Sequence, residues 1–112
     1  MTYGTRIAVI PAGEHWPNGS LRPSFEDWIG AGAIISHLQG KNLQGSLSPE
    51  AQAAMLAYQS VHSNLKPLLQ QCGSGRELIQ RGFPRDVDLS AELDVSNNAP
   101  RLIDGAFIKN VD

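Results

Sequence analysis

Cysteine is almost absent from this sequence, and its scarcity excludes a stabilising disulfide framework. The 112 residues include one cysteine, Cys72. So few cysteines are typical of reducing compartments, and we expect a cytoplasmic location. Long apolar runs are absent too, because none approaches the roughly 20 residues that a membrane-spanning helix needs. The N-terminus has no basic stretch followed by an apolar one, so the sequence predicts no secretory signal and no membrane partner.

A surplus of charge of one sign is also missing. Nine basic residues stand against eleven acidic residues, and the formal net charge is −2. Without a basic stripe the chain has no electrostatic footprint for nucleic acid, and we expect no nucleic-acid partner. The length predicts a single domain over residues 1–112.

A short apolar run stands near the start of the chain. Residues 5–10, TRIAVI, are rich in β-branched side chains and nearly all apolar, and they are followed by Pro11. Such a run is typical of a strand covered on both faces, as in a parallel sheet under helices. The backbone of that strand needs neighbouring strands, and the rest of the sequence offers few. The chain therefore looks like the second half of an α/β protein.

Helical patterns fill most of the remaining sequence. Ser24 and Asp27 fit a capping box, and Ser48 with Pro49 fits the start of another helix. We expect helices at residues 24–39, 49–62, 65–71, 74–82 and 87–93, loops at 40–48 and 96–100, and a short extended segment at 101–108. The fold class is therefore α/β, with one or two strands packed with four or five helices.

Two glycines interrupt the first helical pattern. Gly30 and Gly32 each cost about 1 kcal/mol against alanine within a helix. They suggest that another backbone packs closely there, and close approach of a ligand is the alternative.

The first candidate site follows the apolar run. Residues 11–22 combine glycine, proline and charged residues where the predicted strand ends, and ligands of open α/β sheets bind at such ends. Glu14 could bind Mg²⁺, and Arg22 could hold a phosphate group with two hydrogen bonds. The alternative is a surface loop with a turn at residues 17–19.

Acidic residues in the next helix extend this candidate. Glu26 and Asp27 lie in its first turn, where acidic side chains complement the helix dipole. Capping needs only one of them, so metal binding stays open for the other, and Asp27 is the better candidate.

The second candidate site is the sequence Ser74-Gly75-Arg76. Free N–H groups at a helix start, a hydroxyl and an arginine can together hold an anion. The alternative is a simple capping box of Ser74 and Glu77, with Arg76 in solvent.

Two long blocks of the sequence resemble the 2-phosphosulfolactate phosphatase family. They are AVIPAGEHWPNGSLRPSFEDWIGAGAII at residues 8–35 and CGSGRELIQRGFPRDVDLSAELDVSNNAPRLIDGAF at residues 72–107. Both mix glycine, proline and charged residues at fixed offsets, so the match is more specific than a lone glycine-rich pattern. The resemblance covers the C-terminal half of the family and implies half of a two-lobed α/β fold.

The resemblance implies a phosphoric monoester hydrolase that depends on Mg²⁺ and acts on a small phosphorylated substrate. The named member of the family serves coenzyme M biosynthesis. By resemblance, Glu14 and Arg22 are the catalytic candidates, and Glu14 and Asp27 are the metal candidates. The phosphate-binding candidates are Gly13, Arg22, Ser74, Gly75 and Arg76.

The resemblance also bears on partners. The family's site lies between two halves of the fold, so we expect a homo-oligomer or a complementing N-terminal half. The alternative function is a non-catalytic remnant that acts as a self-association or interaction module.

Overall fold

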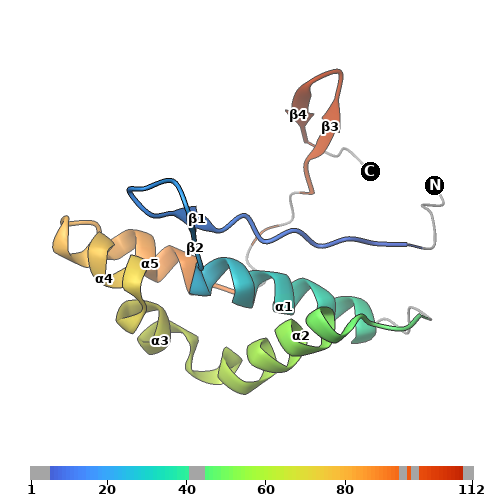
Figure 1. Cartoon of the computed structure of the whole chain (residues 1–112), viewed down its shortest axis with the longest axis horizontal. Helices are drawn as coiled ribbons and strands as arrows, with labels where there is room; N and C mark the ends of the chain where they lie inside the picture. The colour runs from blue at the N-terminus through green and yellow to red at the C-terminus, as the bar shows by residue number, and fades with distance from the viewer. Residues whose placement is uncertain (1–5, 41–44, 94–95, 97–98, 110–112) are drawn as a thin grey trace.

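The computed structural model describes residues 6–40, 45–93, 96 and 99–109. In this part of the chain, Figure 1 shows a layer of helices with two short strand pairs beside it. The elements are β1 (Glu14–His15), β2 (Leu21–Arg22), α1 (Phe25–Gly40), α2 (Pro49–Val61), a 3₁₀ turn (His62–Asn64), α3 (Leu65–Gln71), α4 (Gly73–Gln80), α5 (Pro84–Ser90), β3 (Arg101–Ile103) and β4 (Ala106–Ile108). The α/β composition predicted from the sequence is confirmed.

The strand predicted at residues 5–10 is not formed. Residues 6–10 follow an extended path, and Thr5 lies outside the described residues. Both strand pairs of the described chain are formed by other segments, so residues 6–10 have no neighbouring strand to complete a ladder. The side chains of Ile7 and Ile10 are 63% and 85% exposed, contrary to the expected burial on both faces.

The strands instead form two antiparallel hairpins. In the first, Glu14 lies opposite Arg22, and the N–H of Trp16 donates to the carbonyl of Ser20 at 2.8 Å. The second hairpin is formed by the segment expected to be extended, residues 101–108, which folds back on itself so that β3 pairs with β4. Its two-residue turn, Asp104 and Gly105, has positive φ at both positions (50° and 80°), which is the geometry that follows the natural twist of a hairpin.

The helix starts follow the sequence only in part. Ser48 caps α2 by accepting a hydrogen bond from the N–H of Ala51 at 3.1 Å, and Pro49 occupies the first helical position, as predicted. At α1, Asp27 does not complete the expected capping box, because its Oδ2 accepts from the N–H of Gly13 at 2.9 Å. This bond fastens the start of the β1–β2 hairpin to α1.

Helix α4 begins one residue earlier than the predicted range of 74–82 and ends two residues earlier, at Gln80. Its N-cap is Cys72, so Ser74 lies within the first turn and does not cap the helix. Gly82 has a φ of 87°, its N–H donates to Ile79 and the N–H of Phe83 donates to Leu78. These two bonds form a Schellman motif, which satisfies the last carbonyl groups of α4.

Helix α5 begins at Pro84, three residues before the predicted start at Val87. Proline suits the first helical position because its missing N–H would have no partner there. Asp86 therefore lies within the first turn instead of at the cap. Of the two predicted loops, residues 41–44 and 97–98 lie outside the described residues.

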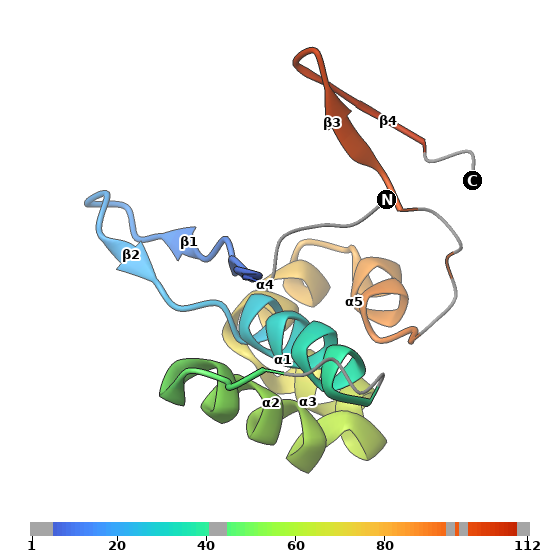
Figure 2. The ribbon, with the colours of Figure 1, turned by 90° about the vertical axis from the view of Figure 1, so that its right-hand side faces the viewer.

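The core is centred where α1 crosses the other helices. Its buried cluster consists of Ile29, Tyr58, Leu65, Leu69 and Val87, which come from α1, α2, α3 and α5. Figure 2, a view along the helical layer, shows α1 stacked on α2 and α3, while the β3–β4 hairpin stands away from the helices. None of the described helices has the length and apolar character needed to cross a lipid bilayer.

The two glycines of α1 have different environments. Gly32 is buried, and an added Cβ there would collide with the backbone of Ala54 and lie 2.9 Å from Cβ of Tyr58. Close packing of α1 on α2 at Gly32 is therefore confirmed. Gly30 is exposed and has nothing within 4 Å of an added Cβ, so close packing at Gly30 is wrong.

The substitution Gly32→Ala is expected to lower the free energy of unfolding by about 1–3 kcal/mol, because the added methyl group forces the helices apart. Gly30→Ala is the matched control, and it should raise the free energy by about 0.5–1 kcal/mol through helix propensity. Urea denaturation of the two variants measures both effects. Equal effects of the same sign would contradict the packing described here.

Candidate functional site

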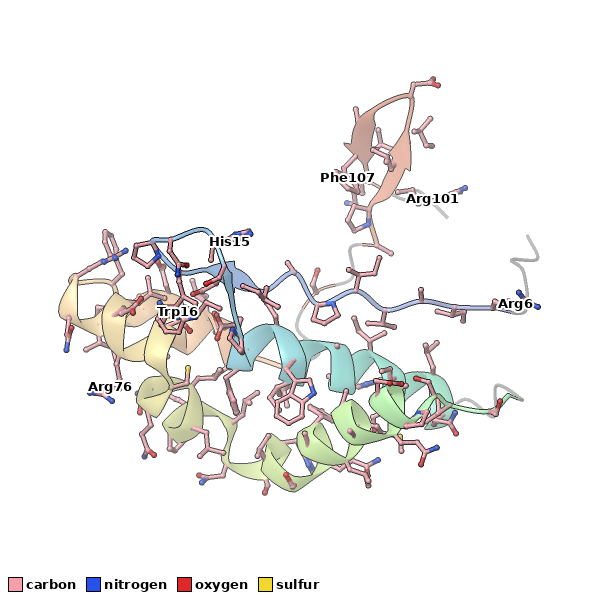
Figure 3. All side chains as sticks on the ribbon, viewed as in Figure 1. Arg6, His15, Trp16, Arg76, Arg101 and Phe107 are labelled. Atoms are coloured by element: carbon pink, nitrogen blue, oxygen red, sulfur yellow. The ribbon has the colours of Figure 1, made fainter. Side chains whose placement is uncertain are left out.

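A small pocket lies where the β1–β2 hairpin meets the N-terminal end of α4. Its volume is about 210 Å³, and its lining consists of Glu14, Trp16, Arg22, Pro23, Phe25, Gly73 and Ser74. Figure 3 shows the labelled Trp16 between the hairpin and α4. The pocket therefore joins parts of both candidate sites that are far apart in the sequence.

Arg22 is the central side chain of this pocket. Its Nη1 donates a hydrogen bond to Glu77 Oε2 at 3.2 Å and lies 2.9 Å from Glu77 Oε1, and its Nε lies 3.6 Å from the carboxylate of Glu14. The Arg22 side chain is 17% exposed, so these charges interact in partly dehydrated surroundings. Arg22 connects the hairpin to a helix 55 residues further along the chain.

The guanidinium group of Arg22 also contacts the ring of Trp16 with its face and lies close to Gly73 at its edge. Its Cζ lies 4.9 Å from the ring centroid of Trp16, within the range of a cation–π contact. An added Cβ at Gly73 would lie 2.8 Å from Nη2 of Arg22, so glycine lets this nitrogen approach the first turn of α4 without being displaced. Of the guanidinium nitrogens, Nη2 is the one directed at the first turn of α4.

Glu26 lies beneath the first turn of α4. Ser74 Oγ donates to Glu26 Oε2 at 2.7 Å, and Cys72 Sγ lies 3.6 Å from Ser74 Oγ. Because Glu26 receives the hydroxyl hydrogen, Ser74 can meet a phosphate group only through its backbone N–H in this arrangement.

The pKa of Glu26 is lowered from its ordinary value of 4.5. Burial raises the pKa of Glu26, but hydrogen bonds from Ser24, Ser74 and its own backbone outweigh burial. Of the two serines, Ser24 makes the weaker contact with Glu26, because the distance and angle of its buried Oγ do not satisfy those of a hydrogen bond. Glu26 is therefore a carboxylate near neutral pH and keeps Ser74 in place.

The other predicted residues lie in different surroundings. Gly13 and Asp27 bind each other and do not line the pocket. Gly75 is buried, with an added Cβ colliding with the carbonyl of Leu69, so its local role is packing of α4 on α3. Arg76 is exposed and extends away from the hairpin in Figure 3. Glu14, Arg22 and Ser74 are the predicted residues that the pocket brings together.

Sequence reasoning missed several residues of this site. The sequence predicts Glu77 only as part of a capping box, and it does not predict Trp16, Phe25 or Gly73 as site residues. One signal was available: the turn at residues 17–19 places positions 14 and 22 opposite each other in a hairpin, which predicts a pair between Glu14 and Arg22. No local signal could link Arg22 to Glu77, because that contact depends on how α4 packs.

Preformed metal sites are absent from the described residues, where no group of three or more histidine, cysteine, aspartate or glutamate side chains could hold an ion. Glu14 offers a carboxylate at the pocket wall. Mg²⁺ commonly uses one or two carboxylates and completes its ligands with water and phosphate oxygens. Glu14 therefore fits Mg²⁺ only as one ligand among water and phosphate oxygens.

Comparison with known proteins gives a consistent result. A model of the 2-phosphosulpholactate phosphatase family matches residues 3–105. Two curated proteins, each named "Probable 2-phosphosulfolactate phosphatase", from Thermotoga petrophila and Thermotoga maritima, are each 30% identical to the chain over 87 residues. No solved structure matches it significantly.

The chain belongs to the 2-phosphosulfolactate phosphatase family, as its sequence motifs predicted. The match covers 78% of this chain but 37% of each of the two relatives. The chain therefore spans little more than a third of the length of these relatives.

The hydrogen bond between Ser74 and Glu26 predicts a pH-dependent effect. A lowered carboxyl pKa contributes stability that is complete above 4.5 and is lost as the pH falls through the pKa of the folded state. We expect Ser74→Ala to reduce the free energy of unfolding by about 1 kcal/mol near neutral pH, and by less in acid.

Urea denaturation at neutral pH and below pH 4.5 measures this difference. Ser90→Ala is the control, because Ser90 Oγ donates to a backbone carbonyl that does not titrate. If the effect of Ser74→Ala on the free energy of unfolding stays constant across this pH range, the hydrogen bond from Ser74 does not lower the pKa of Glu26.

Proposed function

We propose that this chain forms the phosphate-binding part of a Mg²⁺-dependent phosphatase that acts on 2-phosphosulfolactate, in coenzyme M biosynthesis. In this reaction water attacks the phosphorus atom, the phosphorus–oxygen ester bond breaks, and the leaving oxygen takes a proton. The products are an alcohol and inorganic phosphate. The observation that supports the proposal most is the position of Arg22, which is held rigidly with Nη2 directed at the start of α4.

Arg22 binds and orients the phosphate group in this proposal. Its Nη1 and Nε are engaged by Glu77 and Glu14, while Nη2 can donate to a phosphate oxygen. The backbone N–H groups of Gly73 and Ser74 lie in the first turn of α4, where N–H groups have no helical acceptor. Together they supply donors for the charge that develops on the phosphoryl oxygens.

The charges around Arg22 supply the reason for a metal ion. Two carboxylates, from Glu14 and Glu77, flank one guanidinium group. A phosphate dianion entering this negative surrounding would be repelled. Mg²⁺ held by Glu14 and the phosphate itself would supply the missing positive charge and would polarise the phosphoryl group when bound. Asp27 remains the second metal candidate through its Oδ1, since its Oδ2 binds Gly13.

We propose that the chain alone binds substrate but turns it over poorly. The pocket has one wall from the hairpin and one from α4, and phosphoryl transfer needs charges arranged in a site that excludes water. The relatives extend far beyond the matched part, which is where a further wall would come from.

Calorimetric titration with 2-phosphosulfolactate, with and without Mg²⁺, tests the proposal. Arg22→Ala should abolish binding in both conditions. Glu14→Gln should have opposite effects: weaker binding with Mg²⁺, because a ligand is lost, and about tenfold tighter binding without Mg²⁺, because a repelling carboxylate is removed. Arg85→Ala is the control, because Arg85 is exposed on α5 and lies outside the pocket.

Release of inorganic phosphate is measured in the same samples and should be negligible for the 112-residue chain. Binding that is unchanged in Arg22→Ala would remove the pocket from the proposed function. No binding by the unaltered chain would favour the non-catalytic interaction module instead.

A further inference from the structure

The extended segment at residues 6–12 has the properties of a strand without a partner. Its residues are apolar apart from Arg6, and no other strand of the described chain pairs with it. Among the described residues, none forms a hydrogen bond with its backbone groups, which run along the upper side of α1 in Figure 1. A row of unpaired N–H and C=O groups is a template for another strand.

An apolar groove lies directly beneath this segment. It has a volume of about 910 Å³ and is bounded by residues 6–9, by α1 at Trp28, Ala31 and Ile35, and by the start of α2 at Ala51 and Ala54. The groove is larger than the pocket at Arg22, but its walls carry few charged groups. It is therefore suited to apolar side chains of a protein and not to a phosphorylated small molecule.

The chain exposes much more surface than a compact monomeric protein of the same mass. Its accessible surface is 8822 Å², whereas a compact monomer of this mass exposes about 6,000 Å². Its radius of gyration is 15.8 Å, against about 13 Å for a compact chain of this length. Two copies therefore have a combined excess of roughly 5,600 Å², which leaves room for an obligate dimer interface of about 2,000–5,000 Å² in total.

We propose that a second copy of this chain covers this surface, with residues 6–10 of the two copies paired as antiparallel strands about a twofold axis. In an isologous pair, the same segment of each copy supplies hydrogen-bond partners for the backbone of the other. The antiparallel direction follows from Arg6, the one charge of the segment. In that direction the two Arg6 side chains lie at opposite ends, whereas parallel pairing would place like charges side by side.

The exposed apolar residues around the segment fit the same interface. The β3–β4 hairpin lies on the same side of α1 as the segment in Figures 1 and 2. Its Leu102 and Phe107 are 62% and 75% exposed. This proposal does not rest on the proposed phosphatase function, because it concerns association of the chain in the absence of substrate.

Sedimentation of the full chain at micromolar concentrations tests the proposal, and a dimer is expected. Ala8→Pro should convert it to a monomer, because proline removes a backbone donor in the middle of the pair. The helices of this variant should persist in circular dichroism, since residue 8 makes no hydrogen bond with any residue that the structure describes. Ile79→Asp, which alters an exposed apolar residue on α4, is the control and should remain a dimer.

A position-specific cross-link distinguishes this interface from other contacts. In a Cys72→Ala background, Ala8→Cys should be joined between copies by a short bis-maleimide, while Gln80→Cys on α4 should not. A monomeric unaltered chain, a dimer that persists in Ala8→Pro, or equal cross-linking at both positions would overturn the proposal. A chain that remains monomeric until another polypeptide is added would overturn it as well.

Discussion

The order of the candidate site depends on the contact between Arg22 and Glu77. Strands β1 and β2 have two residues each, and a hairpin of that size is at best marginally stable alone. Two contacts fasten it to the helices: the bond from Gly13 to Asp27, and the pair of Arg22 with Glu77 on α4. The second contact also forms the pocket, because it brings the hairpin wall and the helix wall together.

The same contact explains the chemical character of the site. A guanidinium group that binds two carboxylates and an aromatic face has little freedom to move, so its remaining nitrogen points in a fixed direction. The cost of this rigidity is an excess of negative charge around the one arginine. We therefore expect a phosphate group to bind there more tightly when a cation comes with it. The arrangement thus links a structural requirement of the fold to the proposed need for Mg²⁺.

Local sequence signals predicted the parts of the structure that local interactions decide. The N-cap of α2 at Ser48 and the glycine that follows α4 at Gly82 depend on a few neighbouring residues. The prediction of a strand at residues 5–10 was wrong, because a strand forms only where a neighbouring strand pairs with it, whatever its own side chains are. The site was half predicted: Glu14, Arg22 and Ser74 meet, but Glu77 and Glu26 become part of it only through the packing of α4. No sequence window contains both sides of those contacts.

Hydrogen exchange of the β1–β2 hairpin in Glu77→Gln tests the central role of Arg22 most directly. The N–H of Trp16 is bonded within the hairpin, 61 residues before position 77 in the printed sequence. If the pair with Glu77 holds the hairpin, losing about 1 kcal/mol should speed exchange of this N–H about fivefold. Exchange in Glu50→Gln, a control on α2, should be unchanged. Equal protection of Trp16 in Glu77→Gln and the unaltered chain would contradict the account.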